Sequence, residues 1–366
     1  MKIGILTQPL NANYGGVLQN YALQKILQRY GHNPLTINKM RVRKETLIKK
    51  FGKFVIRLLH SRYEHSYLTW KTRDKLVANI HSFISENITI TPRIFTKEEF
   101  LKVIEQENCD AYIVGSDQCW RPIYSPDILN YFLDFCRDSK VRKIAYATSF
   151  GTDKWEFSPI LTDSARNLIK NFDAISVREY SALNLCKSHL NADAEWVLDP
   201  TMLLDADDYS IFIRDKSKIG VTEYFLEDTE LSKLLEKNIL DKLKIDRVVK
   251  NHQSTMLKRF DSLKNYQAIS VEEWLSNIAN ASYVITDSFH GVVFSIIFNT
   301  PFMVSLNTIR GNTRIESLLK DFNLEECIFN PDKDFKMPVF DWDRINRHRA
   351  NRQKHSLAFL KSALEK

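Results

Sequence analysis

The stretch YVITDSFHGVVFSIIFNTPF, residues 283–302, places a histidine where an α/β protein can hold a ligand. Residues 283–286 predict a short buried strand and residues 291–298 predict a helix, so His290 falls in the turn between them. Such a turn brings the carboxyl end of a strand beside the free N–H groups of a helix, which favour an anion. An imidazole there can donate a proton or stabilise developing charge. The alternative is a capped helix whose histidine is only packed.

The other residues of this turn suit the same purpose. Ser288 or Asp287 can cap the helix, and Gly291 lets a ligand approach the backbone. We therefore expect the whole turn to contact a negatively charged ligand.

A second candidate turn follows the first predicted strand, KIGILT, and precedes a helix that ends at Gly31. It lacks the pattern G-x-G-x-x-G, so a dinucleotide fingerprint is absent. We expect it to face a ligand because its amides serve no obvious packing need, the alternative being a purely structural turn. The candidate residues are Asn13, Tyr14, Gly15, Gly16 and Gln19.

A third group of polar residues follows the predicted strand 112–114. Sugars combine hydroxyls that need acceptors with faces that stack on aromatic rings, so an acid beside amides and a tryptophan is a candidate sugar site. The alternative for Asp117 is the cap of a turn. The residues are Ser116, Asp117, Gln118 and Trp120.

Arg178 ends the predicted strand AISV, residues 174–177. A guanidinium offers a planar fork to a carboxylate or a phosphate, so Arg178 is a candidate anion ligand. The alternative is an ion pair with Glu179 or with an aspartate of a neighbouring loop.

The composition is that of a folded globular protein with an anionic partner. Of the 366 residues, 44% are hydrophobic and 27% are charged, and the net charge is +7. The five cysteines are widely spread and form no C-x-x-C pair, which indicates neither a zinc site nor a disulfide framework. No run approaches the roughly 20 apolar residues of a membrane span, and the first residues predict a core strand rather than a signal segment. We therefore expect a cytoplasmic protein.

Strands and helices alternate twice along the chain, which predicts two α/β domains. We place the first domain at residues 1–205 and the second at residues 206–340. Residues 341–366 predict a long basic helix that packs back across both domains. Asp199, before the proline at the end of the first half, is expected to be a structural hinge residue.

Residues 44–62 predict a basic amphipathic helix, with an apolar stripe opposite lysines and arginines. Such a helix can lie on an anionic membrane, and the alternative is a surface helix packed on its own domain. Each basic residue near an anionic bilayer contributes about 1 kcal/mol. Replacing Lys49, Lys50 and Lys53 by Glu should then abolish sedimentation with anionic vesicles without changing turnover on a soluble acceptor. Equal sedimentation of this variant would support the packed helix.

Taken in order, the motifs resemble the polysaccharide pyruvyl transferase family over nearly the whole chain. The matching pieces are ILT with NYGGVLQNYALQ, then IVGSDQCW, YFLDF, KIAYATSFG, ISVRE, VLDPTMLL, VEEWL, and YVITDSFHGVVFSIIFNTPF followed by RIESLL. The resemblance implies a fold similar to the GT-B glycosyltransferases, α/β with two Rossmann-like domains facing a cleft. It also implies transfer of a pyruvyl group from phosphoenolpyruvate onto two sugar hydroxyls, which gives a cyclic ketal.

The resemblance also implies roles for particular residues. The anion-binding arginine of the family falls on Arg178 and its active-site histidine on His290. Better-known members carry Arg-Leu-His where this chain has Ser-Phe-His, so one donor-binding guanidinium is either missing or supplied from elsewhere. Arg314, Arg310 and Lys250 are the candidates, and the sequence does not decide among them.

The leading hypothesis is a cytoplasmic enzyme that adds a pyruvate ketal to a sugar of a surface polysaccharide or its lipid-linked precursor. It needs no cofactor besides phosphoenolpyruvate as the donor, no metal and no nucleic acid. The alternatives are a GT-B glycosyltransferase that uses a nucleotide sugar, and a non-catalytic carbohydrate- or lipid-binding module. The expected catalytic residues are His290 and Asp117. The expected donor contacts are Arg178, Ser288, Phe289, Gly291 and Arg314, and the expected acceptor contacts are the residues of the second and third groups other than Asp117.

Overall fold

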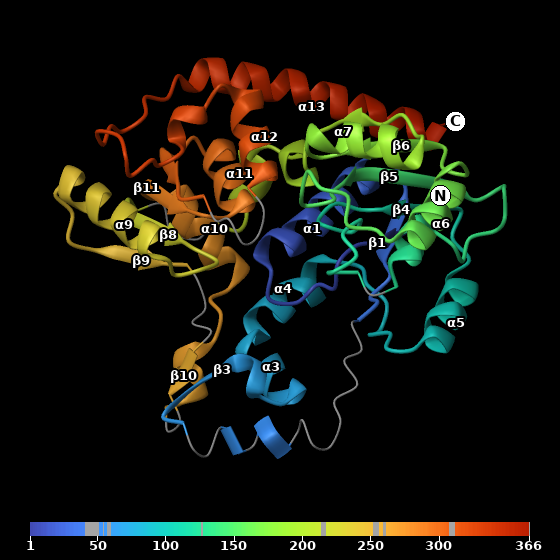
Figure 1. Cartoon of the computed structure of the whole chain (residues 1–366), viewed down its shortest axis with the longest axis horizontal. Helices are drawn as coiled ribbons and strands as arrows, with labels where there is room; N and C mark the ends of the chain where they lie inside the picture. Colours follow the sequence, from blue (N-terminus) through green and yellow to red (C-terminus); the bar gives the residue numbers. More distant parts are fainter. Residues whose placement is uncertain are drawn as a thin grey trace.

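The computed structural model describes residues 1–40, 51–53, 55–56, 60–125, 127–213, 217–251, 256–258, 261–306 and 312–365 (Figure 1). Most of the predicted basic helix 44–62, including Lys49 and Lys50, lies outside the described residues, as does Arg310. No helix in the described part of the chain is both long enough and apolar enough to cross a bilayer.

The first half of the chain forms a six-stranded parallel sheet with helices on both faces. Its strands, in spatial order, are β2 (Asn33–Thr36), β1 (Lys2–Leu6), β4 (Ala111–Val114), β5 (Arg142–Thr148), β6 (Ala174–Val177) and β7 (Glu195–Trp196). Alternate residues point to opposite faces, so Ile3 and Ile5 join one core cluster and Leu6 joins another. Helices α1 (Tyr14–Arg29) and α4 (Ala78–Asn87) cover the first face, and α5 (Lys97–Glu107) and α6 (Pro159–Ile169) cover the second.

The second half forms a four-stranded parallel sheet. Its strands, in spatial order, are β12 (Phe302–Val304), β11 (Ala281–Thr286), β8 (Ile219–Tyr224) and β9 (Val248–Lys250). Helices α10 (Val271–Ala279) and α11 (Phe289–Ile297) cover one face, and α9 (Glu230–Leu243) covers the other. The face under α10 and α11 shares one continuous core with α1 and α4, so the two halves pack on each other through these helices.

The strand order reverses once in each sheet, and ligands of open α/β sheets bind at such places. In the first sheet the reversal lies between β1 and β4, because β2 precedes β1 in space and every later strand follows β4. In the second sheet it lies between β8 and β11. The chain therefore brings two switch points together between its two sheets.

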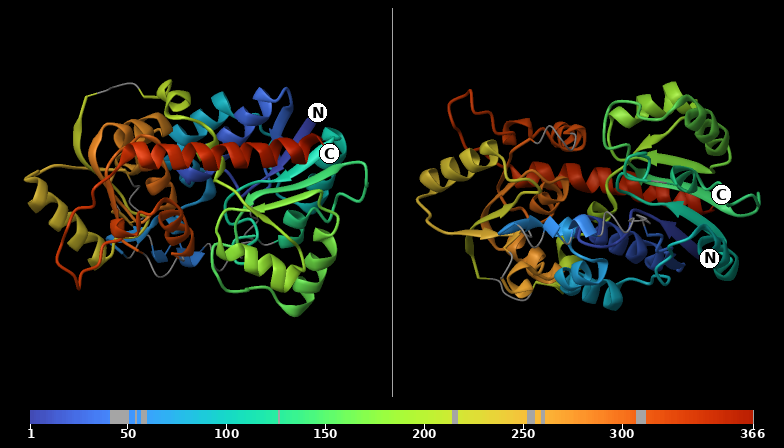
Figure 2. Two further views of the ribbon diagram at one scale, coloured as in Figure 1. Left: turned by 90° about the horizontal axis from the view of Figure 1, so that it is seen from above. Right: turned by 60° about the horizontal axis from the view of Figure 1, so that its bottom comes forward.

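The last helix, α13 (Trp342–Glu365), runs across both halves, as the sequence predicts (Figure 2). Its Ser356 hydroxyl accepts a hydrogen bond from the backbone N–H of Leu198, 2.9 Å away. Its Arg352 pairs at 2.9 Å with Asp321 of α12 (Thr313–Phe322), in the second half. The helix thus ties the first half to the second.

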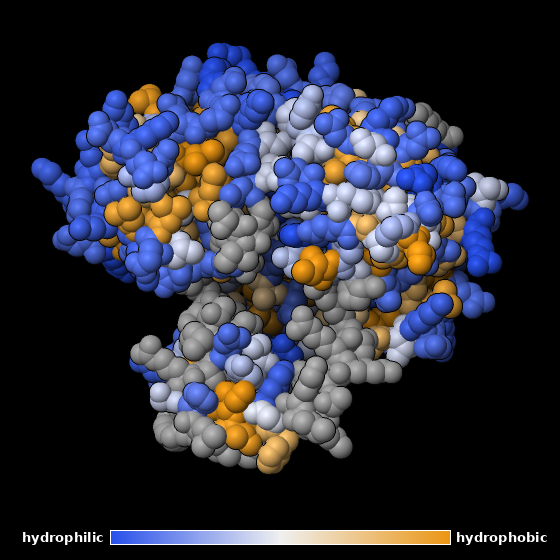
Figure 3. Space-filling view, in the orientation of Figure 1, coloured by the Kyte–Doolittle hydropathy of each residue, from blue (hydrophilic) through white to orange (hydrophobic). Residues whose placement is uncertain are grey.

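A small lobe that the sequence analysis did not predict lies below the two halves (Figures 1 and 3). Its strands β3 (Arg62–Glu64) and β10 (Met256–Lys258) pair antiparallel, although they come from different halves of the chain. Helix α3 (Trp70–Leu76) packs beside them through a small apolar cluster. Two further short helices, α7 (Ser181–Leu185) and α8 (Ala206–Ser210), precede strands β7 and β8 in the chain.

Candidate active site

A cleft of about 680 Å³ lies between the carboxyl ends of the two sheets. From the first half it is lined by residues that follow β1 and β4, and from the second half by residues that follow β8 and β11. These are the two switch points, so the topology itself builds the cleft. The lining residues include Asn13, Trp70, Asp117, Gln118, Tyr124, Leu226, Ser288, Phe289, His290 and Arg314.

His290 lies in the first turn of α11 rather than before it, because the helix begins at Phe289. Its imidazole is buried against the start of α1, and a Cβ atom built on Gly15 would collide with the ring. Only glycine at position 15 leaves room for this contact between the two halves. The N-cap residue of α11, Ser288, makes no side-chain hydrogen bond to the helix.

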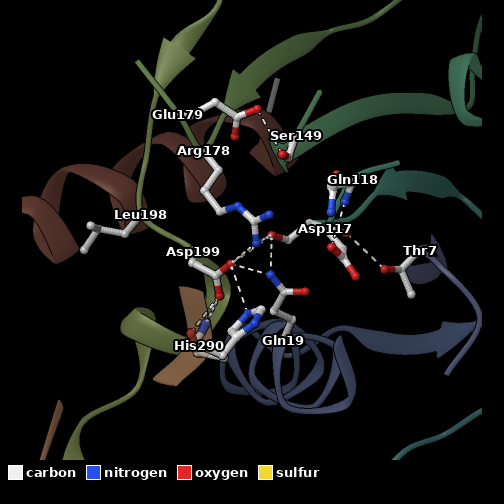
Figure 4. A network of polar contacts seen from close by, with 12 residues as sticks. Thr7, Gln19, Asp117, Gln118, Ser149, Arg178, Glu179, Leu198, Asp199 and His290 are labelled. Carbon is white, nitrogen blue, oxygen red and sulfur yellow. Dashed lines mark hydrogen bonds and ion pairs between the residues drawn. The ribbon is translucent and has the colours of Figure 1, made fainter. Parts of the chain in front are cut away.

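A network of polar side chains surrounds Asp199 behind the cleft (Figure 4). Its Oδ2 atom accepts hydrogen bonds from Arg178 Nη1 at 2.7 Å, from Ser116 Oγ at 3.1 Å and from Gln19 Nε2. Nε2 of His290 lies 3.7 Å from the same oxygen. The network therefore joins β6, β4, α1 and α11 at one carboxylate.

The charge state of Asp199 follows from these partners. Burial by itself would raise its pKa, but the His290 ring and the Arg178 guanidinium hold the pKa well below the usual range of a carboxyl group. Asp199 is thus an anion at neutral pH. Its side chain is fully enclosed, at 0% exposure, against 1% for Arg178.

Arg178 lies behind the cleft and does not line it. Its guanidinium pairs with Asp199 and stacks over the ring of Phe289, 4.5 Å from the ring centre. The ion pair with an aspartate of a neighbouring loop, the alternative given above, is therefore what the structure shows. Nε and Nη2 of Arg178 are buried without hydrogen-bond partners.

Arg314 of α12 does line the cleft. Its Nε atom is buried without a hydrogen-bond partner. Burial, and after it the charge of Arg178, lower the pKa of Arg314 to about 10. A guanidinium that is desolvated and repelled by a second cation is poised to accept an anion. Lys250, another candidate for the missing guanidinium, instead pairs at 2.9 Å with Glu223.

Two helices begin at the cleft with open first turns. Neither α1 nor α11 has an acidic residue in its first turn, and neither N-cap side chain bonds to its helix. Asn13, the N-cap of α1, instead donates to Asp117 Oδ2 at 3.3 Å. Arg314 and the amino ends of these two helices therefore contribute positive charge and partial positive charge on the same side of the cleft.

Comparison with known families decides the class of the protein. The family described as polysaccharide pyruvyl transferase matches residues 13–307, most of the chain. The chain belongs to this family. It is therefore a transferase, and the cleft with His290 is its candidate active site.

Solved structures show the fold of this pyruvyl transferase family member. Arabidopsis thaliana UGT89C1, solved with UDP-L-rhamnose, is 8% identical with a TM-score of 0.51, and the match covers 98% of this chain and 97% of that one. UDP-GlcNAc 2-epimerase from Neisseria meningitidis is 10% identical with a TM-score of 0.46, and 99% and 94% of the two chains are covered. The first of these shows a GT-B fold. No curated protein matches the sequence.

Several predicted residues of the pyruvyl transferase site line the cleft. Asp117 and Gln118 line it after the end of β4, and Asp117 has a positive φ of 75°. Such a backbone conformation is uncommon outside glycine and is often found at functional sites. Asn13, Ser288 and Phe289 also line the cleft.

Other predicted residues do not line it, and their roles are structural. Trp120 is fully buried, stacks on Phe132 and donates its N–H to the carbonyl of Tyr131, so it cannot stack on a sugar. Gly291 faces Thr286, because an added Cβ atom would collide with that side chain, and so it does not serve ligand approach.

The turn between β1 and α1 contributes less to the cleft than we expected. Tyr14 stacks on Trp274, with ring centres 5.4 Å apart. Gly15 and Gly16 do not line the cleft, and Gln19 and Ser116 belong to the network of Asp199. Asp287 does not cap α11, since its carboxylate accepts from the N–H groups of Leu226 and Glu227.

Two aromatic residues that reach the cleft were not predicted from the sequence. Trp70, at the start of α3, and Tyr124, in the loop after β4, both line it. No local pattern marks Trp70, because the lobe that carries it is assembled from both halves of the chain. Asp199 was expected to be a hinge residue, whereas its carboxylate is the centre of the buried network.

In the described part of the chain, no group of three or more His, Cys, Asp or Glu side chains could hold a metal ion.

Proposed function

We propose that this transferase moves the pyruvyl group of phosphoenolpyruvate onto two hydroxyls of a sugar in a surface polysaccharide or its lipid-linked precursor. The observation that carries the proposal is the inner wall of the cleft, where Arg314 and two open helix ends stand beside His290. Phosphoenolpyruvate carries a phosphate and a carboxylate, which match such a wall.

The reaction needs two C–O bonds at C2 of the donor and one new C–H bond at C3. The C2–O bond to phosphate breaks. The two sugar hydroxyls lose two protons in all, and in the net balance C3 gains one of them and the departing phosphate gains the other. In the proposal, His290 supplies the proton to C3 or stabilises the charge at C2, and Asp117 takes a proton from a sugar hydroxyl. Both side chains line the same cleft, although they come from different halves.

The direct test is release of phosphate from phosphoenolpyruvate by the purified protein. We expect release only when a lipid-linked or soluble oligosaccharide acceptor is present, with a ketal in the product. A nucleotide sugar that is consumed instead would support the glycosyltransferase alternative, which the GT-B fold also allows. Binding of sugar with no turnover of either donor would support a binding module.

Membrane attachment through residues 44–62 remains part of this proposal, because a lipid-linked acceptor lies at a bilayer. The vesicle experiment on Lys49, Lys50 and Lys53 tests it separately from the chemistry.

Replacement of Arg314 by glutamine should weaken donor binding and stabilise the free protein. The lowered pKa of Arg314 means that the charged guanidinium destabilises the folded state. This loss of folding free energy is fully present below about pH 10 and is relieved as the pH rises through that value. Loss of the charge removes this cost but also removes a charge-assisted hydrogen bond, worth about 1.5 to 3 kcal/mol. We expect the Michaelis constant for phosphoenolpyruvate to rise at least tenfold and the melting temperature at pH 7 to increase.

The control is Lys320→Gln, which removes an exposed cation from the same helix. It should change neither quantity noticeably. An unchanged Michaelis constant in Arg314→Gln would remove Arg314 from the donor site.

A further inference from the structure

Asp199 is placed to control the histidine of the site rather than to touch a substrate. It does not line the cleft, yet it lies between the side chain of Arg178 and that of His290 (Figure 4). Both oxygens of the carboxylate are engaged. Oδ1 accepts from the N–H of Thr201 at 3.1 Å and from its hydroxyl at 2.7 Å. The carboxylate plane is thereby fixed, and Oδ2 is left for the network.

Burial of the Asp199 carboxylate costs free energy unless close partners stabilise its negative charge. An ion taken out of water is stabilised only by close partners, and replacement of such pairs by apolar residues is often neutral or stabilising. Asp199 collects Arg178, Gln19 and Ser116 from the first half on the oxygen that also faces His290 of the second. The arrangement therefore does more than neutralise an arginine, because it aims an anion at one nitrogen of the imidazole.

The two nitrogens of His290 have different surroundings. Nε2 faces Asp199 Oδ2 at 3.7 Å, and it has no hydrogen-bond partner at this separation. Nδ1 lies on the side of Gly15, at the open start of α1. A carboxylate accepts but does not donate, so it favours the tautomer with the proton on the nitrogen that it faces. Hydrogen bonds of this kind are often long before substrate binds.

We propose that Asp199 is a positioning residue that keeps a proton on Nε2 of His290, so that Nδ1 is the nitrogen that exchanges a proton with the substrate. The proposal rests on the proposed function for the identity of that substrate, but the tautomer itself does not depend on it. When the imidazolium gives up its Nδ1 proton, the ring stays neutral with Nε2–H directed at the carboxylate, as in other carboxylate–histidine pairs. Asp199 keeps its own charge throughout.

The test reads the tautomer directly by ¹⁵N NMR of protein labelled at histidine, without any substrate. The chain has nine histidines, so the His290 signals are assigned as those missing from His290→Asn. At a pH where the ring is neutral, we expect the proton on Nε2 in the wild-type protein and a mixture of tautomers in Asp199→Asn. A proton on Nδ1 in the wild-type protein, or the same tautomer in both proteins, would overturn the proposal.

Asp321→Asn is the matched control. Asp321 is also a nearly buried carboxylate that binds an arginine and a histidine, with Arg352 Nε at 2.9 Å and His348 Nε2 at 3.0 Å, but it lies between α12 and α13. The Asp321→Asn variant should have a lower melting temperature than the wild-type protein, the same His290 tautomer, and turnover within a few-fold of the wild-type value. Asp199→Asn should lose at least tenfold more turnover than this control, and an equal loss in both would contradict the proposal.

The wild-type spectrum can still overturn the proposal if Asp199→Asn does not fold, because a proton on Nδ1 would contradict it. It also separates this inference from the proposed function. If the protein releases no phosphate from phosphoenolpyruvate but carries the proton on Nε2 of His290, phosphoenolpyruvate is not the donor. The proposed role of Asp199 is then not contradicted.

Discussion

His290→Asn should lose at least two orders of magnitude in turnover while its melting temperature stays within a few degrees of the wild-type value. Loss of a positioned acid costs about 10² to 10⁴ in rate, whereas loss of a packed side chain costs stability. Asparagine keeps a polar group near Asp199 and needs less room beside Gly15. The variant should still bind phosphoenolpyruvate measurably, because Arg314 and the helix ends remain.

Three measurements on the same preparation check this expectation: turnover with acceptor, thermal unfolding, and calorimetric binding of phosphoenolpyruvate. A variant that unfolds early but turns over normally at low temperature would identify His290 as a core histidine. The histidine would then serve only the contact between α11 and α1.

Gly15→Ala should reduce turnover about as strongly as removal of the histidine, although it changes no reactive group. The added methyl group would occupy the position of the His290 ring, and the ring belongs to a helix that cannot retreat without moving the second half. Alanine is favoured over glycine inside a helix by about 0.5 to 1 kcal/mol, so α1 itself does not suffer. We therefore expect a turnover loss near 100-fold, in the range of a displaced acid.

Gly16→Ala is the matched control in the next position of the same helix. Its Cβ atom would lie 3.1 Å from Nδ2 of Asn13, the far end of a side chain that can shift, and at an ordinary contact distance of 3.5 Å from Oδ2 of Asp117, and His290 is not among its nearest neighbours. Turnover within a few-fold of the wild-type value is expected. Equal losses in both variants would show that the start of α1 matters for its backbone rather than for the space beside His290.

Much of the cleft could be predicted because the carboxyl ends of parallel strands meet at one edge of a sheet. The ends of β4 and β11 were visible in the sequence as apolar runs followed by polar residues, and Asp117 and His290 at these ends both line the cleft. Arg314 was one of three candidates for a missing guanidinium. The structure distinguishes it from Lys250, whose amine is paired with Glu223.

The errors concern residues whose surroundings come from other segments of the chain. Trp120 follows a strand end, as a sugar-stacking residue would, but Phe132 covers one face of its ring and the carbonyl of Tyr131 takes its N–H. Asp199 precedes a proline in a connection and looks like a hinge, whereas four separate elements direct polar groups at it.

The sequence by itself determined the GT-B architecture, the family and the strand-to-helix turn that carries His290. The strand-to-helix turn depends on hydrophobic period and on turn residues, whereas the family, and the GT-B fold that the resemblance implies, depend on the order of motifs along the chain. Only the tertiary structure decided that Arg178 serves Asp199, that Trp70 reaches the cleft from a lobe built by both halves, and that Gly15 makes room for His290. Burial and pairing depend on which segments meet in space, and contacts between residues of different elements, 21 residues apart for Arg178 and Asp199, leave no local pattern that could reveal them.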